Sequence, residues 1–304
     1  MPATDSAAAT GILDPAPEPS LPTRPLERML RLFSDVREGE GPRLLALTLN
    51  VFLILVAYYL MKPVREVLIL AQPGGAELKS YVAQGFKAVK MRVGAMDGHI
   101  VASLDRVDTA RDAIGNLIDL MVDAHGTMSV GQAKQFCHEA SDLNLRFIEE
   151  PVMSDDRSGL AEVRAASSTP VAAGESEFSR FDFAELIDRR AVDVLQPDLA
   201  IAGGFSEGLR IMALCEAHRV ELAPHCWGSA ISFQAGLTLA FASSSGVYME
   251  VPMGGDPLLR EMASITLELK DGMLAPPAGP GWGVDPDPQF VRRYAQGRGA
   301  RSGE

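Results

Sequence analysis

Basic residues are scarce in this chain of 304 residues: 28 Lys and Arg stand against 40 Asp and Glu, a formal net charge of −12. Proteins that bind a nucleic-acid backbone present a basic face, so we expect no nucleic-acid partner. Cysteine is rarer still, and Cys137, Cys215 and Cys226 form no CxxC pair. This excludes a disulfide scaffold and indicates buried structural thiols in a reducing compartment.

Several familiar motifs are also missing. No GxGxxG or P-loop sequence opens a helix, which argues against an open nucleotide-binding sheet. No basic segment followed by an early apolar core marks a secretory signal. Residues 1–25 are instead rich in proline and alanine with few large apolar side chains, and we predict a disordered tail.

One long apolar run is present, at residues 44–61 (LLALTLNVFLILVAYYLM), between Arg43 and Lys62. As a helix rising about 1.5 Å per residue, it could cross most of a hydrocarbon core of about 30 Å. Two interpretations stay open: a transmembrane helix that contacts or tethers the protein to a membrane, or a buried core helix. Within segment 26–84, residues 31–84, above all AYYLMKPVRE, resemble the start of bacterial ATP/ADP-translocase-like or major-facilitator transporters, although the remaining helices of a transporter are absent.

From residue 85 to the end at 304, short aliphatic runs alternate with helical periodicity, which is typical of parallel βα units. The pattern predicts seven strands, at residues 88–93, 118–123, 145–149, 171–175, 192–196, 220–225 and 247–250. We therefore predict an α/β fold, a (β/α)7β TIM-type barrel.

Acidic residues end three consecutive predicted strands: Asp123, Glu149 and Glu175, each separated from the next by 26 residues, one strand plus one helix. Three carboxylates at adjacent strand ends predict a site for one hard divalent cation. Mg²⁺ prefers oxygen ligands and keeps positions open for water or substrate, so we predict Mg²⁺ as the cofactor.

The same register continues with Asp198, His225 and Glu250 at the next strand ends. An aspartate beside a histidine can fix its tautomer and raise its basicity, so Asp198 and His225 are a candidate general base with its orienting partner. His125 follows Asp123 by two residues, and we expect it to contact substrate.

Lys90 and Arg92 are spaced by two on the first strand and project from the same face. There they could balance the charge of the metal site and hold an anionic substrate.

Residues 85–296 resemble the barrel domain of the enolase superfamily, in the mandelate racemase/muconate lactonizing enzyme group. The segments GFKAVKMRVG, LMVDAHG, FIEEP, VAAGES, VLQPDLAIAGG, LAPHCWG and PGWGV carry the resemblance. It implies that Asp123, Glu149 and Glu175 bind Mg²⁺, that Asp198 and His225 form a His–Asp dyad, that Glu250 stabilises an enolate by hydrogen bonding, and that Lys90 and Arg92 occupy a Lys-x-Lys position. It also implies that Glu150 faces away from the site, and that the barrel is cytoplasmic.

Two departures from the family shape the functional prediction. The N-terminal capping domain and the first barrel strand are not recognisable, so we expect a barrel truncated at its first strand. Arg92 replaces the second lysine of Lys-x-Lys, and a guanidinium stays protonated in proteins. His225 is then the one competent base. We expect it to abstract the proton α to a carboxylate, after which the β-hydroxyl is lost and His225 can return the proton. The predicted function is an acid-sugar dehydratase.

Alternatives remain: an epimerase, racemase or sugar-lactone cycloisomerase of the same group, or a catalytically silent membrane-tethered fusion or truncated chain. The substrate would be a small carboxylate, and a homo-oligomer stays open. At the junction, residues 67–71 form an aliphatic run and residues 76–84 a helical one. Because an unpaired strand edge favours aggregation, we predict that this unit packs beside the strand of Lys90.

Overall fold

The computed structural model describes residues 74–253, 256–263, 269–277 and 279–294. The chain divides into two units, Met1–Leu70 and Ala71–Glu304, and every described residue belongs to the second. The predicted tail, the apolar run 44–61 and the aliphatic run 67–71 lie outside the described residues and stay predictions. None of the helices in the described ranges has the length and apolar character needed to cross a membrane.

Strands and helices alternate along the second unit. In chain order the elements are α3 (Gly74–Ala83), β1 (Ala88–Arg92), η1 (Ala95–Asp97), α4 (Ile100–Ile114), β2 (Asp119–Asp123), α5 (Val130–Glu139), η2 (Ser141–Leu143), β3 (Leu145–Glu149), α6 (Arg157–Ala166), β4 (Val171–Ala173), α7 (Arg180–Asp188), β5 (Val194–Leu195), α8 (Phe205–His218), β6 (Glu221–Leu222), α9 (Ala230–Ala242), α10 (Pro257–Arg260) and α11 (Pro288–Tyr294).

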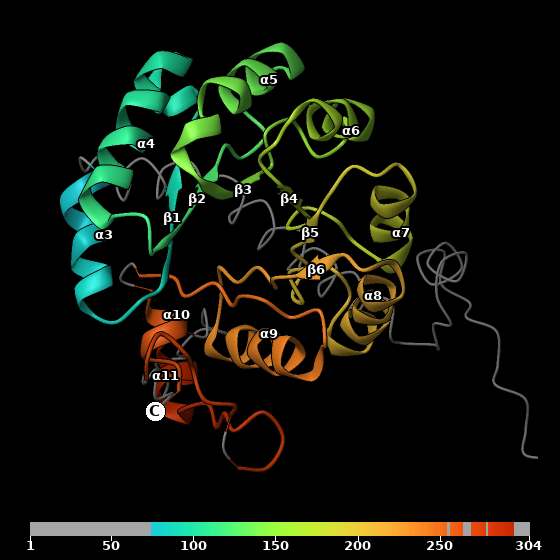
Figure 1. Cartoon of the computed structure of the whole chain (residues 1–304). Coiled ribbons are helices and arrows are strands. Elements are labelled where there is room, and N and C mark those ends of the chain that lie inside the picture. Colours follow the sequence, from blue (N-terminus) through green and yellow to red (C-terminus); the bar gives the residue numbers. More distant parts are fainter. Residues whose placement is uncertain (1–73, 254–255, 264–268, 278, 295–304) are drawn as a thin grey trace, which may run out of the picture. The chain divides into compact units, whose positions relative to one another are not determined.

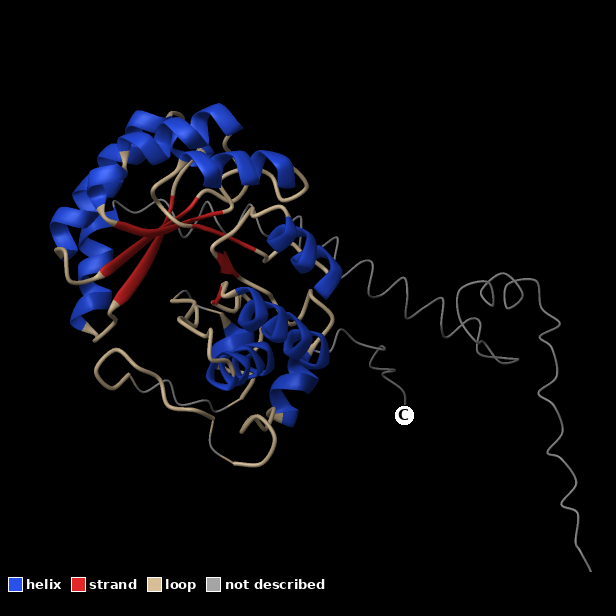
Figure 2. Cartoon of the chain, turned by 45° about the vertical axis from the view of Figure 1, so that its right-hand side comes forward, coloured by secondary structure: helices blue, strands red, loops and turns tan. Residues whose placement is uncertain are grey.

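The six strands form one parallel sheet in the order β1-β2-β3-β4-β5-β6. Parallel neighbours need a crossover between them, and each successive pair is joined by a helix. The helices lie around the outside of the strands (Figures 1 and 2). The predicted α/β fold with a parallel sheet is confirmed.

Alternation along the strands separates the core from the site. In β1, Val89 and Met91 are buried in the large apolar cluster that also contains residues of the surrounding helices, whereas Lys90 lies on the opposite face. That opposite face carries a second, smaller apolar cluster, made of Met121, Phe147, Ala172, Val194 and Ala223. The sheet is thus buried on both faces, as parallel sheets usually are.

The predicted strands shorten toward the C-terminal half. Residues 192–196 and 220–225 yield only β5 and β6, with two residues each. The predicted strand 247–250 is not a strand: past β6 the ladder continues only as a parallel bridge between Leu222 and Gly246. Beyond the bridge, Tyr248 and Glu250 are held through their side chains instead of by ladder hydrogen bonds.

Helix α3 belongs to the same core as the sheet. It packs against α4 and β1, Leu78 is buried in the large cluster, and the ring of Tyr81 meets that of Phe86 edge-on at 6.4 Å. The predicted helix 76–84 is therefore present and lies beside the strand of Lys90.

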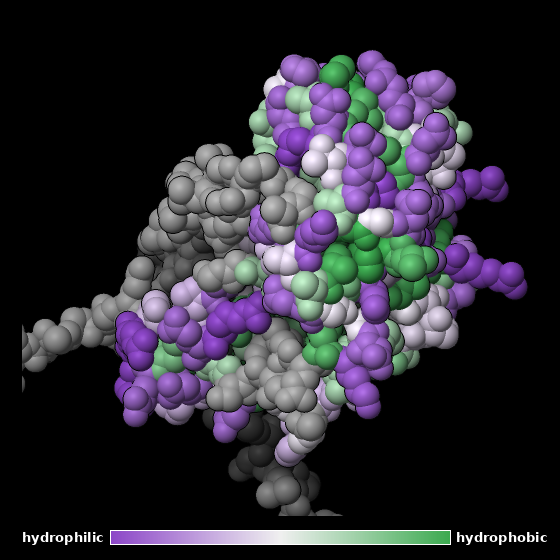
Figure 3. Space-filling model, turned by 60° about the vertical axis from the view of Figure 1, so that its left-hand side comes forward, coloured by the Kyte–Doolittle hydropathy of each residue, from purple (hydrophilic) through white to green (hydrophobic). Residues whose placement is uncertain are grey.

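Hydrophobic areas lie among hydrophilic ones on the side of the molecule seen in Figure 3. Val101 on α4 and Leu117 before β2 are among the exposed large apolar side chains of the described part. Apolar atoms make up much of any protein surface, so such scattered side chains need no partner to explain them.

Candidate active site

The predicted site residues lie at the carboxyl ends of the strands. Asp123 and Glu149 are the last residues of β2 and β3, and Lys90 and Arg92 lie in β1. Glu175 follows β4 by two residues, and Asp198 and His225 follow β5 and β6 by three. Carboxyl ends of parallel strands share one edge, where βα folds place their chemistry. The structure brings all of these side chains into one network.

The three predicted metal ligands each have a different partner. Asp123 accepts the backbone N–H of His125 at 2.8 Å and pairs with Arg92 at 3.4 Å. Glu149 Oε2 contacts Lys90 Nζ at 2.5 Å and accepts from Gln196 Nε2 at 2.7 Å. Glu175 contacts His225 Nε2 at 3.1 Å and His125 Nδ1 at 3.3 Å. Cationic or hydrogen-bonding groups thus offset all three carboxylates.

One oxygen of this set is buried without a hydrogen bond. Glu149 Oε1 has no partner among the described residues, although the Glu149 side chain is only 1% exposed. A buried carboxylate oxygen without a partner is costly, and a hard cation with oxygen ligands would satisfy it. The oxygen donors of Asp123, Glu149 and Glu175 therefore suit Mg²⁺ in kind, whereas the compact group of ligand atoms among the described residues is that of His125, Glu150 and Glu175.

His225 is held between two carboxylates. Its Nδ1 lies 2.8 Å from Asp198 Oδ2, and both side chains are buried. Its Nε2 faces Glu175 at 3.1 Å and Glu250 at 3.7 Å. Asp198 therefore fixes the ring orientation and leaves Nε2 directed into the site.

Lys90 lies between Glu149 and Glu250, with its Nζ 3.0 Å from Glu250 Oε1. Burial by itself would lower the pKa of Lys90, but the charges of Glu149, Glu250 and Asp123 together raise it well above its ordinary value. Lys90 is therefore protonated at neutral pH and acts as a cation and a hydrogen-bond donor.

The pKa values of the two carboxylates that contact Lys90 shift in opposite directions. Burial, together with the charges of Asp123 and Glu250, raises the pKa of Glu149 even though Lys90 opposes it. Burial would also raise the pKa of Glu250, but Lys90 and His225 outweigh it and hold that pKa below its usual value. An ionised Glu250 accepts hydrogen bonds, so in this state Lys90, not Glu250, is the donor available to an enolate oxygen.

Burial would lower the pKa of His225, but the charges of Glu175 and Glu250 and the hydrogen bond to Asp198 raise it well above its ordinary value. The carboxylate that contributes most to this increase, Glu175, is also a predicted metal ligand. Metal occupancy and the basicity of His225 are therefore coupled.

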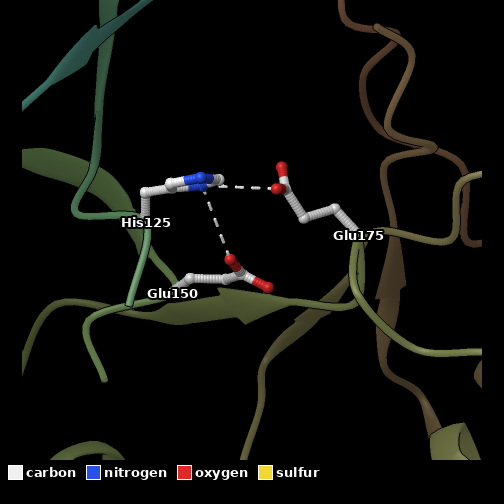
Figure 4. Close-up of side chains that lie close together, drawn as sticks. All are labelled: His125, Glu150 and Glu175. Carbon is white, nitrogen blue, oxygen red and sulfur yellow. Dashed lines mark ion pairs between the residues drawn. The ribbon is translucent and has the colours of Figure 1, made fainter. Parts of the chain in front are cut away.

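A second group of side chains meets beside Glu175. His125 Nδ1 lies 3.3 Å from Glu175 Oε1 and 3.9 Å from Glu150 Oε2, and the three ligand atoms all lie within 4.8 Å of one another (Figure 4). The expectation that Glu150 faces away from the site is wrong. Strand alternation does not apply to Glu150, because it lies beyond the end of β3 with φ at +36°.

Two residues of this network were not found from the sequence. Gln196 donates to Glu149, and Glu150 joins His125 and Glu175. Gln196 stands at the end of a predicted strand, two residues before Asp198, and its position in the register was the available signal. No sequence signal marks the positive φ of Glu150.

Comparison with known proteins identifies the family. Residues 75–290 match the family described as Enolase C-terminal domain-like. The chain belongs to the enolase superfamily. The match covers the barrel domain of the mandelate racemase/muconate lactonizing enzyme group and includes α3.

Relatives and solved structures agree with this assignment. D-galactonate dehydratase of Ralstonia pickettii (strain 12J) is 37% identical over 230 residues, covering 71% of this chain and 60% of the relative. The 3,6-anhydro-D-galactonate cycloisomerase of Zobellia galactanivorans has a TM-score of 0.67 at 32% identity, covering 72% of this chain and 61% of that one. A racemase of Streptomyces coelicolor A3(2), solved with bound magnesium, has a TM-score of 0.66 at 27% identity, covering 74% and 60%.

The chain spans about 60% of the length of these relatives. The family match, residues 75–290, spans the six strands and the helices between them. Because the family match begins at residue 75, the prediction that the transporter-like segment extends to residue 84 is wrong, and the comparisons do not support the transporter resemblance of the residues before it. Membrane contact through residues 44–61, cellular location and oligomeric state stay predictions.

Proposed function

We propose that this chain carries the catalytic barrel of a Mg²⁺-dependent acid-sugar dehydratase. It would remove the proton α to the substrate carboxylate and release the β-hydroxyl as water, leaving a 2-keto-3-deoxy acid. The observation that carries the proposal is the buried His225, oriented by Asp198 at 2.8 Å, with Nε2 directed toward Glu175 and Glu250. The identity to D-galactonate dehydratases makes D-galactonate the first substrate to test.

The cationic side chains argue for a single base. Arg92 pairs with Asp123 at 3.4 Å, and a guanidinium does not deprotonate in proteins. Lys90 has a raised pKa and contacts two carboxylates. His225 is then the residue that takes the α-proton, and Lys90 donates to the developing negative charge.

Asp123, Glu149 and Glu175 would hold the metal. When bound, Mg²⁺ supplies positive charge for the enolate form of the substrate and offsets the carboxylates that raise the pKa of His225. Glu149→Gln should therefore abolish the thermal stabilisation that Mg²⁺ gives to the wild-type protein. Unchanged stabilisation in this variant would contradict the metal assignment.

Loss of the β-hydroxyl requires an acid, and the site holds a second imidazole. His125 follows β2, contacts the other oxygen of Glu175, and is 26% exposed at its side chain. His125 and His225 thus flank Glu175 from β2 and β6. We assign His225 to the α-proton and His125 to the leaving hydroxyl.

Isotope exchange tests these two roles separately. The full chain is incubated with Mg²⁺ and D-galactonate in deuterated water, while α-proton exchange and 2-keto-3-deoxy product are followed by NMR. His225→Asn should lose both exchange and product, whereas His125→Asn should retain exchange and lose product. Exchange that persists in His225→Asn would show that another group, such as Lys90, is the base.

A cycloisomerase is the second candidate, because one of the matching structures is a 3,6-anhydro-D-galactonate cycloisomerase at 32% identity. It would use the same base without releasing water. A panel of aldonic, aldaric and anhydro acids and their lactones distinguishes the two functions by product mass: a dehydratase product is lighter by one water, and an isomer has unchanged mass. Products of unchanged mass alone would overturn the dehydratase proposal.

A further inference from the structure

We propose that His125, Glu150 and Glu175 form a second cation site, for a borderline divalent ion such as Zn²⁺ or Co²⁺, beside the all-oxygen set of Asp123, Glu149 and Glu175. The two sets share Glu175. The proposal concerns binding alone and does not depend on the dehydration reaction.

The spacing of the three side chains fits a small coordination shell. Metal–ligand bonds of about 2.1 Å in tetrahedral geometry place neighbouring ligand atoms about 3.4 Å apart. His125 Nδ1 lies 3.3 Å from Glu175 Oε1 and 3.9 Å from Glu150 Oε2, and all three atoms lie within 4.8 Å of one another. The His125–Glu175 distance already matches that spacing, and the imidazole of His125 faces both carboxylates (Figure 4).

The backbone builds this cluster at two adjacent strand ends. His125 and Glu150 follow β2 and β3 and have backbone φ angles of +48° and +36°, which residues other than glycine rarely adopt. The backbone N–H of Gly126 donates to the carbonyl of Glu150 at 2.7 Å and links the segment after β2 to the segment after β3. Both side chains thereby lie close to Glu175, and Glu150 does so against the strand alternation.

Donor chemistry separates the two sets. An imidazole nitrogen with two carboxylates suits Zn²⁺ or Co²⁺, whereas Mg²⁺ prefers oxygen ligands alone. As carboxylates, Glu150 and Glu175 supply two negative charges, which match one divalent ion. Both carboxylates are about 95% buried, so little water competes for the ion.

The shared carboxylate links the two sites. Glu175 directs Oε1 to His125 and Oε2 to His225, so a cation at the second site would engage the oxygen on the His125 side. We therefore expect Zn²⁺ at this site to weaken Mg²⁺ binding.

Glu149 and Glu150 provide matched variants for the test. The two residues are adjacent and both are buried, but they belong to different sets. Glu149→Gln changes the all-oxygen set, and Glu150→Gln makes the same chemical change in the set that contains His125. Co²⁺ is titrated into the full chain while the visible absorption of a nitrogen-ligated Co²⁺ ion is followed. Its affinity should fall by at least about tenfold in Glu150→Gln and be retained in Glu149→Gln. Mg²⁺ affinity, measured by calorimetry, should show the opposite pattern.

His125→Asn gives an independent test, because the side chain is partly exposed and the variant should fold even if Glu150→Gln does not. It should lose the nitrogen-ligated absorption of Co²⁺ and keep Mg²⁺ binding. Equal Co²⁺ affinity in wild type, Glu150→Gln and His125→Asn would overturn the proposal and leave the cluster as a histidine in contact with two carboxylates. An equal loss in Glu149→Gln and Glu150→Gln would show a single site.

Discussion

Residue identity alone does not set the protonation state of a buried group at this site. Lys90, Glu149, His225 and Glu250 lie within one chain of contacts, and three of the four have a pKa that moves against the direction of burial alone. The charges of neighbouring groups therefore outweigh desolvation for Lys90, His225 and Glu250. The sequence could indicate which residue types meet at the strand ends, but not which of them carry protons.

Asp198→Asn tests the orienting role of Asp198. The amide keeps the size of the side chain but removes the charge that holds the His225 tautomer, so turnover should fall by about 100-fold. Mg²⁺ affinity should be unchanged, because Asp198 is not in the predicted metal set. Asp188→Asn, an exposed change at the end of α7, is the control. Unchanged turnover in the Asp198→Asn variant would show that His225 does not depend on this partner.

The three thiols give a prediction on pH. Burial raises the pKa of Cys215 and Cys226 to about 12 and also raises that of Cys137. Because the thiolate is the reactive form, none should react with Ellman's reagent at pH 8 until the protein unfolds. Above about pH 9 the thiols ionise in the unfolded protein but stay protonated in the folded one, because their pKa is higher in the folded state. Ionisation favours the unfolded state, so the free energy of unfolding should fall as pH rises above about 9. Rapid labelling of any thiol in the native protein would contradict this.

At the scale of elements, the sequence predicted positions better than lengths. Predicted strand 145–149 coincides with β3, whose residues are buried except for the half-buried Arg146. Strands 192–196 and 220–225 were predicted too long: β5 and β6 end at Leu195 and Leu222, and Asp198 and His225, three residues further on, contact each other in the site. Register therefore follows from apolar patterning, whereas strand ends are decided by the polar contacts of the site.

The N-terminus of α5 allows an element-scale test. Ser129 and Gln132 form a capping box, in which the Ser129 hydroxyl accepts the Gln132 N–H at 3.3 Å and Gln132 Oε1 accepts the Ser129 N–H at 2.9 Å. Ser129→Ala should lower the free energy of unfolding by about 1 kcal/mol, measured by urea denaturation. Thr109→Ala, inside α4, should be near neutral because alanine favours helix. Equal effects of the two changes would show that the cap contributes nothing.

At the scale of the described unit, side chains link the two ends of the sheet. The ladder runs from β1 to β6 and ends at the Gly246 bridge, yet Glu250 reaches Lys90 of β1 at 3.0 Å. Tyr248 donates to Asp119 of β2 at 2.5 Å and accepts from Arg146 of β3 at 3.2 Å, and Arg146 also pairs with Glu221 of β6. The sheet therefore curves until its ends lie across from one another, as a TIM-type barrel requires.

Tyr248→Phe tests whether this cross-sheet link supports the site. The change removes a hydroxyl bonded to both Asp119 and Arg146 but keeps the ring, so unfolding free energy should fall by about 1–2 kcal/mol. Because Glu250 lies two residues further along an unpaired segment, its contact with Lys90 should loosen, and turnover should fall more than substrate affinity. Tyr294→Phe removes an exposed hydroxyl and is the matched control for both measurements. If stability falls while turnover stays at the wild-type value, Tyr248 supports the fold without positioning Glu250, and the curvature of the sheet alone places that carboxylate.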